Sequence, residues 1–256
     1  MKHEIHSTPD RSNPDNIRQM FNAIAPTYDV LNHLMSFGLD IRWRRKAVRL
    51  LEEKHHGVFL DIAAGSGDVS FDLMELHPQH VVAADFARNM LTVLQQKLSQ
   101  RVQSCTIDVV SCDALSLPFQ DEVFDGTIVA FGMRNFADRL QSLKEMLRVL
   151  KPGGISVILE LTKPQAPPFA QLYTVYSRVG LPIMGKIISR HNSAYRYLPE
   201  SIAQFPARNE FCALMETAGF SETNAMSLTF GAATIFIGRK SAAGPTLVET
   251  STMSSK

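Results

Sequence analysis

The chain has 256 residues, of which 45% are hydrophobic and 20% are charged, and its formal net charge is +1. This balance is ordinary for a globular enzyme with one large domain, and the near-neutral charge gives no electrostatic basis for binding nucleic acid. No apolar run approaches the roughly 18 residues of a membrane-spanning helix, and the polar N-terminus lacks the apolar core of a signal peptide. We therefore expect a cytoplasmic protein.

The three cysteines, Cys105, Cys112 and Cys212, are odd in number and show no CxxC spacing. This pattern argues against a disulfide framework and against a zinc site. We interpret all three as small buried hydrophobic residues in a reducing compartment. No cluster of metal-ligating residues occurs either, so no metal site is predicted.

The first 56 residues are predicted to be a helical segment that folds over the ligand site. Apolar residues recur at helical spacing after Pro14, which predicts one helix, and a second helix is expected over 43–53. The apolar positions are Ile17, Met20, Phe21 and Ile24 in the first helix and Trp43, Ala47, Leu50 and Leu51 in the second.

From residue 58 onward, short apolar runs alternate with helical patterns, which indicates a mostly parallel sheet with helices on both faces. A final helix, ending before Gly219, and a strand pair bending near Gly231 predict closure by a C-terminal antiparallel strand. The predicted strands are 58–62, 81–84, 106–110, 124–131, 155–161, 220–228 and 230–237, and the helices are 68–76, 89–98, 140–150 and 209–218. The core is thus expected over 57–160 and 200–240, with a helical insertion at 161–199 and a disordered tail at 241–256.

Residues Asp61 to Asp68 read DIAAGSGD and directly follow the first predicted strand. Gly65 and Gly67 indicate a tight turn into the next helix, the place where an open α/β sheet binds its ligand. A dinucleotide fits poorly, because Asp68 would lie at the helix N-terminus against the phosphates. Ser70 also replaces the third glycine of the dinucleotide motif, and no P-loop sequence occurs.

Two further acids, after the second and third predicted strands, fit a ligand with a ribose and an adenine but no phosphate. Asp85 stands where a carboxylate can accept both ribose hydroxyls. Asp113, followed by Ala114, is placed to accept from an adenine amino group. One acid alone is usually a solvated surface charge. Acids after three consecutive strands, together with a glycine turn, indicate a ligand site instead. S-adenosylmethionine has the required shape, and we predict it as the cofactor.

Four stretches of the chain resemble the ubiquinone/menaquinone C-methyltransferases, a family of class I S-adenosylmethionine-dependent methyltransferases. The resemblance runs from about Tyr28 to Lys240 and implies a Rossmann-like α/β fold with a helical cap. The first and last stretches, with FGMRN, are specific to this family, whereas the others occur with many methyl acceptors. The stretches are YDVLNHLMSFGLDIRWRR (28–45), LPFQDEVFDGTIVAFGMRNFAD (117–138), RVLKPGGISVILELTKP (148–164) and SAYRYLPESI (193–202).

The resemblance also implies site residues and shows departures from the family pattern. Alanines stand at 63 and 64 where the family often has glycines, and Asp40 stands where a histidine is common. Leu31 replaces a methionine, and Ala130 replaces a serine that some members place against the cofactor, so that contact is not carried over. The implied cofactor contacts are Ser66, Asp85, Asp113 and Ala114, with Gly65 and Gly67 forming the turn.

The reaction that the resemblance implies is methylation of a ring carbon on a polyisoprenoid quinol. An aromatic carbon is a weak nucleophile unless an adjacent hydroxyl ionises, so the site must stabilise a developing phenolate. We interpret Arg134 as the group that stabilises this oxyanion and Asn135 as the group that orients the hydroxyl; structural pairing of Arg134 with an acid such as Asp138 is the alternative. Tyr28 and Asp29 are further candidates, for which a structural hydrogen bond is an equal explanation. No general base is identified.

The insertion at 161–199 combines an apolar helical stripe with charge of one sign. It contains no Asp or Glu. A helical insertion that completes the core explains the stripe alone, but basic residues beside it suit an anionic bilayer. We predict a cap that lines the acceptor pocket and leans on the inner face of the cell membrane, so that the protein is peripherally associated. The basic residues are Lys163, Arg178, Lys186, Arg190 and Arg196.

Several alternatives remain open at this point. The favoured reaction converts demethylmenaquinol to menaquinol, because the short N-terminal region and the WRRK and SAYRYLPESI variants look more like the menaquinone-only branch. C-methylation of a benzoquinol in ubiquinone synthesis is the nearest rival, and a non-catalytic cofactor-binding scaffold is a rival of another class. A homodimer is compatible with the sequence, which does not fix the oligomeric state.

Overall fold

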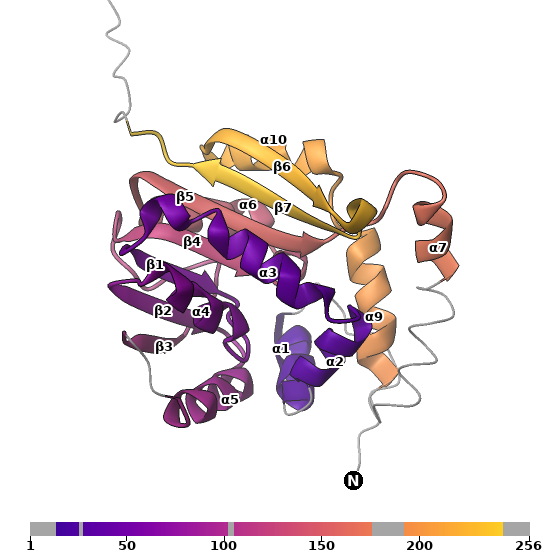
Figure 1. The fold of residues 1–256 in the computed structure, drawn as a ribbon, viewed down its shortest axis with the longest axis horizontal. Helices are drawn as coiled ribbons and strands as arrows, with labels where there is room; N and C mark the ends of the chain where they lie inside the picture. The colour runs from indigo at the N-terminus through magenta and orange to yellow at the C-terminus, as the bar shows by residue number, and fades with distance from the viewer. Residues whose placement is uncertain (1–13, 26–27, 102–104, 176–191, 243–256) are drawn as a thin grey trace, which may run out of the picture.

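The computed structural model describes residues 14–25, 28–101, 105–175 and 192–242. Its centre is a seven-stranded sheet with the strand order β3-β2-β1-β4-β5-β7-β6 (Figure 1). The first five strands run parallel, and β7 pairs antiparallel with both β5 and β6. The strands are β1 (Val58–Ile62), β2 (His80–Asp85), β3 (Ile107–Ser111), β4 (Phe124–Ala130), β5 (Leu150–Leu161), β6 (Ser221–Leu228) and β7 (Ala233–Arg239).

The predicted mostly parallel sheet with a C-terminal antiparallel strand is confirmed. One boundary differs, because β5 begins at Leu150, whereas the sequence placed a helix stop at Pro152–Gly154. Phe124 pairs with Leu150 and Gly126 with Ile155, so the extra residues of β5 form a bulge. A bulge of this kind lets the chain leave the preceding helix and enter the ladder without a separate loop.

Alternate side chains of the strands feed two cores, one on each face of the sheet. On one face, Phe59 packs with the buried sides of α3, α4 and α5. On the other face, Leu60 and Ile62 pack with α6 and α10. These helices are α3 (Leu39–Arg49), α4 (Asp68–Asp72) continued by the 3-10 turn η3 (Leu73–Leu76), α5 (Arg88–Ser99), α6 (Arg139–Val149) and α10 (Arg208–Ala218).

The remaining helices gather at the carboxyl ends of the parallel strands (Figure 1). The sequence missed the short helix α2, and α3 spans Leu39–Arg49, so the expectation of 43–53 was displaced. Gly38, with φ 74°, is the N-cap of α3, and the segment after Leu50 turns into a 3-10 helix, η2 (Glu52–Lys54). The helices at this edge are α1 (Pro14–Ile24), α2 (Tyr28–Met35), α7 (Phe169–Val175) and α9 (Asn192–Ala203).

Within the described ranges, no helix has the length and hydropathy to cross a bilayer. The predicted tail at 241–256 lies almost wholly outside those ranges, as do residues 176–191 of the predicted cap.

Candidate functional site

The turn after β1 depends on left-handed backbone at three positions. Ala63, Gly65 and Gly67 have φ values of 57°, 56° and 88°. A Cβ at Gly67 would lie 2.1 Å from Cδ1 of Leu94 on α5. Glycine therefore avoids a steric clash between the turn and that helix. The turn therefore presents backbone rather than side chains to the space beyond the strand ends.

Asp85, the last residue of β2, fastens this turn to the neighbouring strand. Its Oδ2 accepts from the amide of Gly65 at 2.8 Å, and its Oδ1 accepts from the amide of Ala87 at 2.7 Å. Burial raises the pKa of Asp85 to about 6, although these two amide donors lower it. The carboxylate is thus held in one orientation and titrates close to neutral pH.

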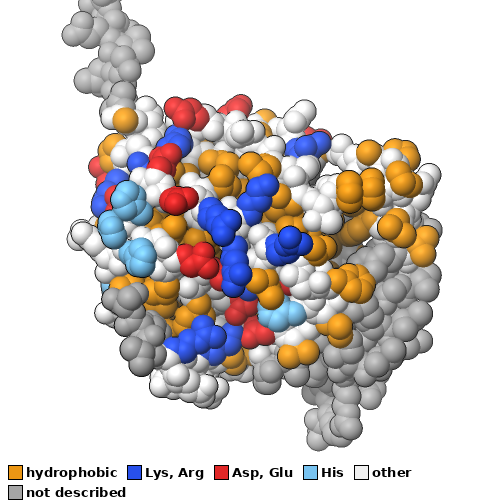
Figure 2. Space-filling model, viewed as in Figure 1, with side chains coloured by type: hydrophobic (Ala, Val, Ile, Leu, Met, Phe, Trp, Pro, Cys, Tyr) orange, Lys and Arg blue, Asp and Glu red, His pale blue; other side chains and the backbone are white. Residues whose placement is uncertain are grey.

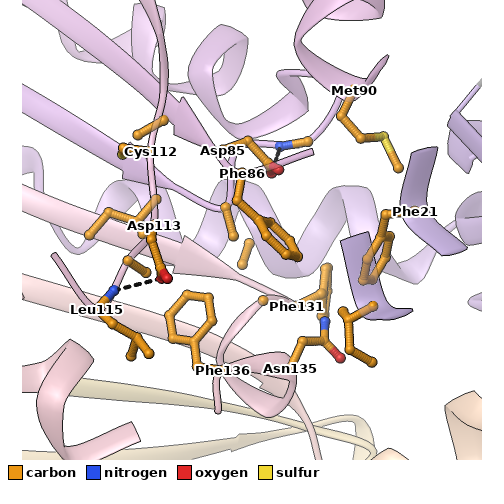
Figure 3. Close-up of a pocket in the computed structure, with 18 of the residues that line it drawn as sticks. Phe21, Asp85, Phe86, Met90, Cys112, Asp113, Leu115, Phe131, Asn135 and Phe136 are labelled. Carbon is orange, nitrogen blue, oxygen red and sulfur yellow. Dashed lines mark hydrogen bonds between the residues drawn. The ribbon is translucent and has the colours of Figure 1, made fainter. Parts of the chain in front are cut away.

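A first cavity lies directly in front of the turn and of Asp85 (Figure 3). Asp113 also lines this cavity, next to the neighbouring strand, and its Oδ1 accepts from the amide of Leu115 at 2.9 Å. Aromatic and aliphatic side chains make up most of the wall between the two acids. The lining includes Phe21, Tyr28, Gly65, Asp85, Phe86, Met90, Cys112, Asp113, Ala114, Leu115, Phe131, Asn135 and Phe136.

Cys112 is a free thiol in this wall, and burial raises its pKa to about 11. The thiol is therefore uncharged at neutral pH and acts as a small apolar surface. Cys105 and Cys212 are also free.

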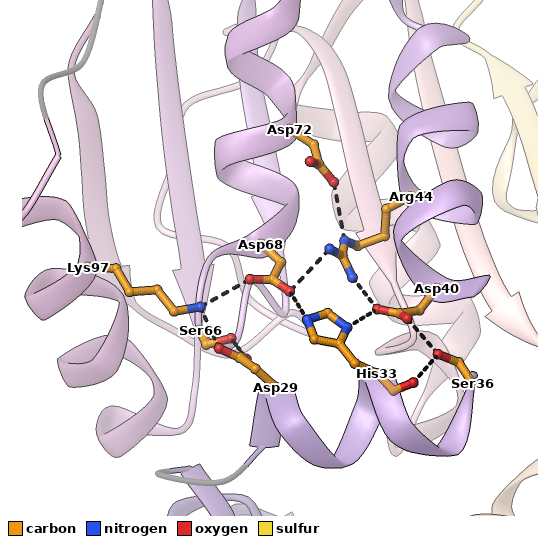
Figure 4. Close-up of polar contacts among 9 residues, drawn as sticks. All are labelled: Asp29, His33, Ser36, Asp40, Arg44, Ser66, Asp68, Asp72 and Lys97. Carbon is orange, nitrogen blue, oxygen red and sulfur yellow. Dashed lines mark hydrogen bonds and ion pairs between the residues drawn. The ribbon is translucent and has the colours of Figure 1, made fainter. Parts of the chain in front are cut away.

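A network of charged side chains holds α2 and α3 against the turn (Figure 4). Lys97 of α5 lies 2.6 Å from Asp29 of α2 and 3.0 Å from Asp68 at the start of α4. The hydroxyl of Ser66, inside the turn, donates to the Asp29 carboxylate. The N-terminal helices are consequently connected by hydrogen bonds and ion pairs to the wall of the first cavity.

Arg44 forms the other half of this network. Its guanidinium lies 2.5 Å from Asp40 and 3.2 Å from each of Asp68 and Asp72. Burial opposes ionisation of Asp40, but the Ser36 hydroxyl and the Arg44 guanidinium outweigh it and hold its pKa below the ordinary value. Asp40 is therefore held in its ionised form, as a weaker base than an ordinary carboxylate.

Arg134 is buried in the 3-10 turn η4 (Met133–Asn135), which follows β4. Its Nη1 lies 2.8 Å from Oε1 of Glu160 and also donates to the carbonyl of Phe131. Burial acts to lower the pKa of Arg134, but Glu160 more than compensates, and the pKa is raised overall. The alternative of a structural pair with an acid is therefore present, but the acid is Glu160 and not Asp138. The side chain of Asp138 instead accepts from the amide of Gln141 and caps α6.

Asn135 and Tyr28 line the first cavity. The hydroxyl of Tyr197, on α9, donates to Oδ1 of Asn135 at 2.7 Å. This bond occupies the amide oxygen, so the amide nitrogen is the atom that can donate to a ligand. Burial raises the pKa of Tyr28, which therefore remains a neutral phenol near neutral pH.

A second, largely apolar cavity adjoins the first one at Phe131, whose side chain lines both. Trp43 forms part of its wall and is held by a 2.9 Å hydrogen bond from its indole Nε1 to Oγ1 of Thr229. Among the polar groups in the lining are Arg134 and Asp40. The other lining residues include Asn32, Met35, Ser36, Phe37, Leu39, Leu161, Tyr173, Leu198, Ile202 and Ala232.

Comparison with known proteins shows which family the chain belongs to. Residues 10–240 match the model of the ubiE/COQ5 methyltransferase family. The chain belongs to this family. It is 47% identical to a demethylmenaquinone methyltransferase of Thermus thermophilus, over 86% of this chain and 99% of the relative. It is 44% identical to a ubiquinone/menaquinone biosynthesis C-methyltransferase of Geobacter sulfurreducens, over 88% and 89% of the two chains.

Solved structures of methyltransferases share the fold of this family member. A SAM-dependent methyltransferase of Aquifex aeolicus matches with a TM-score of 0.55 at 18% identity, covering 75% of this chain and 88% of that one. The CurJ carbon methyltransferase matches with a TM-score of 0.57 at 12% identity, covering 90% and 59%. The predicted family and fold class are thus confirmed, and S-adenosylmethionine is the methyl donor of the family.

The first cavity fits this donor in its own geometry. Asp85 and Asp113 place carboxylates on two sides of a mostly apolar space, which suits the ribose and the base of a nucleoside. The glycine turn brings bare backbone to the same space. In this ubiE/COQ5 family member, Asp85 would hold the ribose hydroxyls and Asp113 the adenine.

The first cavity gathers six of the nine predicted site residues, and three lie outside its lining. Ser66 and Gly67 lie outside the cavity lining, since Ser66 faces Asp29 and Gly67 sits under Leu94. Arg134 faces the second cavity rather than the first. The residues that line the first cavity as expected are Gly65, Asp85, Asp113, Ala114, Tyr28 and Asn135.

Sequence reasoning missed Glu160 and Tyr197, the partners of Arg134 and Asn135. Glu160 is fully buried near the end of an apolar strand, where an unpaired charge is very costly. A glutamate in the run ISVILEL was therefore a signal that a cation had to lie nearby. Tyr197 belongs to SAYRYLPESI, a stretch that carried the family resemblance without a stated role.

Proposed function

We propose that the protein methylates a ring carbon of demethylmenaquinol, with the donor in the first cavity and the quinol ring in the second. The observation that carries this proposal is that the two cavities adjoin at Phe131, beside a buried arginine. The name of the Thermus thermophilus relative supports the naphthoquinol acceptor. The product would be menaquinol, formed late in menaquinone biosynthesis.

The donor supplies an electrophilic methyl group on its sulfonium, and the protein's residues prepare the acceptor. Trp43 and Phe131, with ring centroids 6.4 Å apart, provide aromatic surface for the flat quinol ring. Arg134 stabilises negative charge on the ring oxygen next to the reacting carbon, directly or through a water. Asn135, with its amide nitrogen toward the first cavity, orients the hydroxyl, and the neutral Tyr28 phenol is a second donor there.

Arg134 suits this role because Glu160 and the Phe131 carbonyl fix it from one side. A fixed donor costs no reorganisation when charge develops on the substrate, which is the main source of electrostatic catalysis. The proton of the ring hydroxyl goes to a base that the described residues do not identify. The neutral phenol of Tyr28 is a proton donor rather than an acceptor there.

A benzoquinol acceptor in ubiquinone biosynthesis remains the second candidate. The name of the Geobacter sulfurreducens relative includes both quinone types, and this observation alone favours keeping it. Both acceptors need the same phenolate-stabilising groups, so they differ only in how the ring fills the second cavity.

The proposed substrate also implies where in the cell the protein works. A polyisoprenoid quinol resides in the bilayer, so the enzyme collects it from the membrane surface as a peripheral protein. The segment 161–199 would form part of the acceptor cap, and Leu161, Tyr173 and Leu198 in the lining of the second cavity support this. Of the five basic residues expected to face the bilayer, Arg178, Lys186 and Arg190 lie outside the described residues.

The role of Arg134 distinguishes an enzyme from a non-catalytic scaffold. Arg134→Gln leaves Glu160 buried without its cation, so the test uses Arg134→Gln together with Glu160→Gln, which keeps the site neutral. We expect turnover on reduced demethylmenaquinone to fall by a factor on the order of 100. The dissociation constant of S-adenosylhomocysteine, measured by calorimetry, should stay within roughly threefold, since Arg134 faces the second cavity. Unchanged turnover in a folded double variant would refute the role of Arg134.

A further inference from the structure

Six large hydrophobic side chains of the described residues are exposed, and they come from segments around the second cavity. Val30 and Leu34 lie on α2 and Phe37 directly after it, where it lines the cavity mouth. Leu172 and Val175 lie on α7, beside Tyr173 of the same cavity. Phe230 lies in the 3-10 turn η6 (Thr229–Gly231), which precedes β7. A set of exposed hydrophobic side chains around one cavity is typical of an interaction surface.

Two of these side chains are held outward by unusual backbone. Phe37 and Phe230 have φ values of 53° and 57°, in the left-handed region, and are 75% and 66% exposed. Bulky residues seldom adopt this conformation, and where they do the surrounding structure imposes it. The ring of Phe230 is further fixed by stacking on Phe169 of α7 at a centroid distance of 3.7 Å.

Beside these hydrophobic residues lies a row of cations on α3. The helix sequence LDIRWRRKAVR contains five Lys and Arg residues and one acid. One of the five, Arg44, is buried in the network with Asp40, whereas the other four are exposed. Among the described residues only Arg45 of these four has an ion pair, a loose contact of 3.8 Å to Glu75. The exposed cations are Arg42, Arg45, Lys46 and Arg49.

The two groups lie on one face of the molecule. Figure 2 shows Lys and Arg side chains gathered over α3, with hydrophobic side chains beside them toward α2 and α7. We propose that this docking face, formed by the six hydrophobic residues and the four cations, lies on an anionic phospholipid bilayer. The inference rests on the proposed function, and it places the membrane contact on α2, α3, α7 and η6.

Charge and continuity with the cavity single out a bilayer as the occupant. The whole chain has a net charge of only +1, so four exposed cations on one helix are a local asymmetry. An anionic bilayer attracts such a row, while exposed apolar side chains enter the headgroup region. Because Phe37 belongs both to the cavity lining and to the docking face, a quinol could pass from lipid into the second cavity without crossing water.

Vesicle binding of the full chain tests the proposal. The variants are the pair Lys46→Gln with Arg49→Gln and the pair Leu34→Gln with Leu172→Gln, none of which lines either cavity. The charge-matched control is Arg88→Gln with Lys144→Gln, on α5 and α6. The probes are sedimented vesicles of phosphatidylcholine with and without phosphatidylglycerol.

We expect the wild type and the control pair to bind the anionic vesicles and the basic pair to lose roughly tenfold in partition. The apolar pair should lose binding to a similar extent, and added salt should mimic the basic pair. Equal binding by all variants, or binding that ignores phosphatidylglycerol, would overturn the docking face. A protein partner on this face would show as no vesicle binding by the wild type, which also overturns it.

A parallel assay separates this proposal from the proposed function. With a short-tailed, water-soluble demethylnaphthoquinol, the basic pair and the apolar pair should have the turnover rate of the wild type. With long-tailed quinol in anionic vesicles, their turnover rate should fall by about the same factor as their vesicle binding. No turnover of either acceptor by any form would contradict the proposed function and leave the vesicle result standing on its own.

Discussion

Ala63 shows how one residue of the donor turn departs from its own backbone preference. It adopts a φ of 57°, in the left-handed region where a Cβ costs about 1–2 kcal/mol relative to the right-handed region. Glycine at this position would remove that strain and so stabilise the folded state. Part of this stabilisation would be offset, because glycine has more conformational freedom in the unfolded chain. The family resemblance, which often places glycine here, agrees with the geometry.

We therefore expect Ala63→Gly to raise the free energy of unfolding in urea by up to about 1 kcal/mol. Ala64→Gly is the matched control, because Ala64 is not among the residues with positive φ and should lose about 0.5–1 kcal/mol. Equal destabilisation by the two changes would show that Ala63 is not strained.

If Asn135 orients the ring hydroxyl as proposed, Tyr197 is a positioning residue, because its hydroxyl holds the Asn135 amide. Removing its hydroxyl in Tyr197→Phe frees the Asn135 amide to rotate, since the 2.7 Å bond to Oδ1 is lost. We expect kcat to fall roughly tenfold with little change in cofactor affinity. In an Asn135→Ala background, Tyr197→Phe should lower kcat no further. If the role of Tyr197 were purely structural, the losses in kcat caused by the two changes would instead multiply in the double variant.

The raised pKa of Asp85 leads us to expect that donor binding depends on pH. Its pKa of about 6 lies above the ordinary value because of burial, so the free protein carries a protonated, neutral Asp85 below that pH. A neutral carboxyl is a poorer acceptor for the ribose hydroxyls, and the affinity for S-adenosylhomocysteine should therefore weaken as the pH falls through 6.

Calorimetry between pH 5 and 8 measures this effect, with two variants as comparisons. Asp85→Asn should bind weakly at every pH and lose the dependence near 6. Asp61→Asn should retain it, because Asp61, whose pKa burial raises to about 7, bonds to Ser70 outside the cavity. A pH profile that is flat in the wild type would contradict the role of Asp85.

At the level of elements, Lys97 connects α5 to both α2 and α4. Lys97→Met breaks its ion pairs with Asp29 and Asp68 and leaves their carboxylates without this cation. Because Lys97 is partly exposed, we expect a loss of about 1 kcal/mol, or roughly fivefold in donor affinity, since its ion pairs hold α2 against the turn beside the first cavity. Dissociation of S-adenosylhomocysteine should be faster in stopped flow, whereas Lys54→Met, which breaks a surface pair with Glu53, should not change it.

The elements also show what periodicity alone can predict. The alternation of apolar strands and amphipathic helices predicted the parallel part of the sheet, because β1, β2 and β4 are short and mostly buried runs. The edge strand β3 is partly exposed. The alternation failed at α2, a helix of eight residues that offers little more than two turns of pattern. It also could not predict that β7 inserts between β5 and β6, since that order follows from packing across the sheet.

At the scale of the whole molecule, the donor side was predictable and the acceptor side was not. Asp85 and Asp113 follow strands and were visible in the sequence, because parallel strands bring their carboxyl ends to one edge. The second cavity assembles residues from α2, α3, β5, α7 and α9, which are far apart in the chain. Such a site depends on tertiary contacts, so the sequence pointed to Arg134 and Asn135 only through the family resemblance and their position after the fourth strand.

The central claim is that donor and quinol meet where the two cavities adjoin. The most direct test is mass spectrometry of the acceptor after incubation of the purified protein with S-adenosylmethionine. The acceptors are reduced demethylmenaquinone, its oxidised form and a demethylated benzoquinol. We predict the gain of one methyl group on the reduced naphthoquinol and none on the oxidised form, because only the quinol has a ring hydroxyl to ionise. Methylation of the benzoquinol alone, or of neither quinol while the donor still binds, would contradict this account.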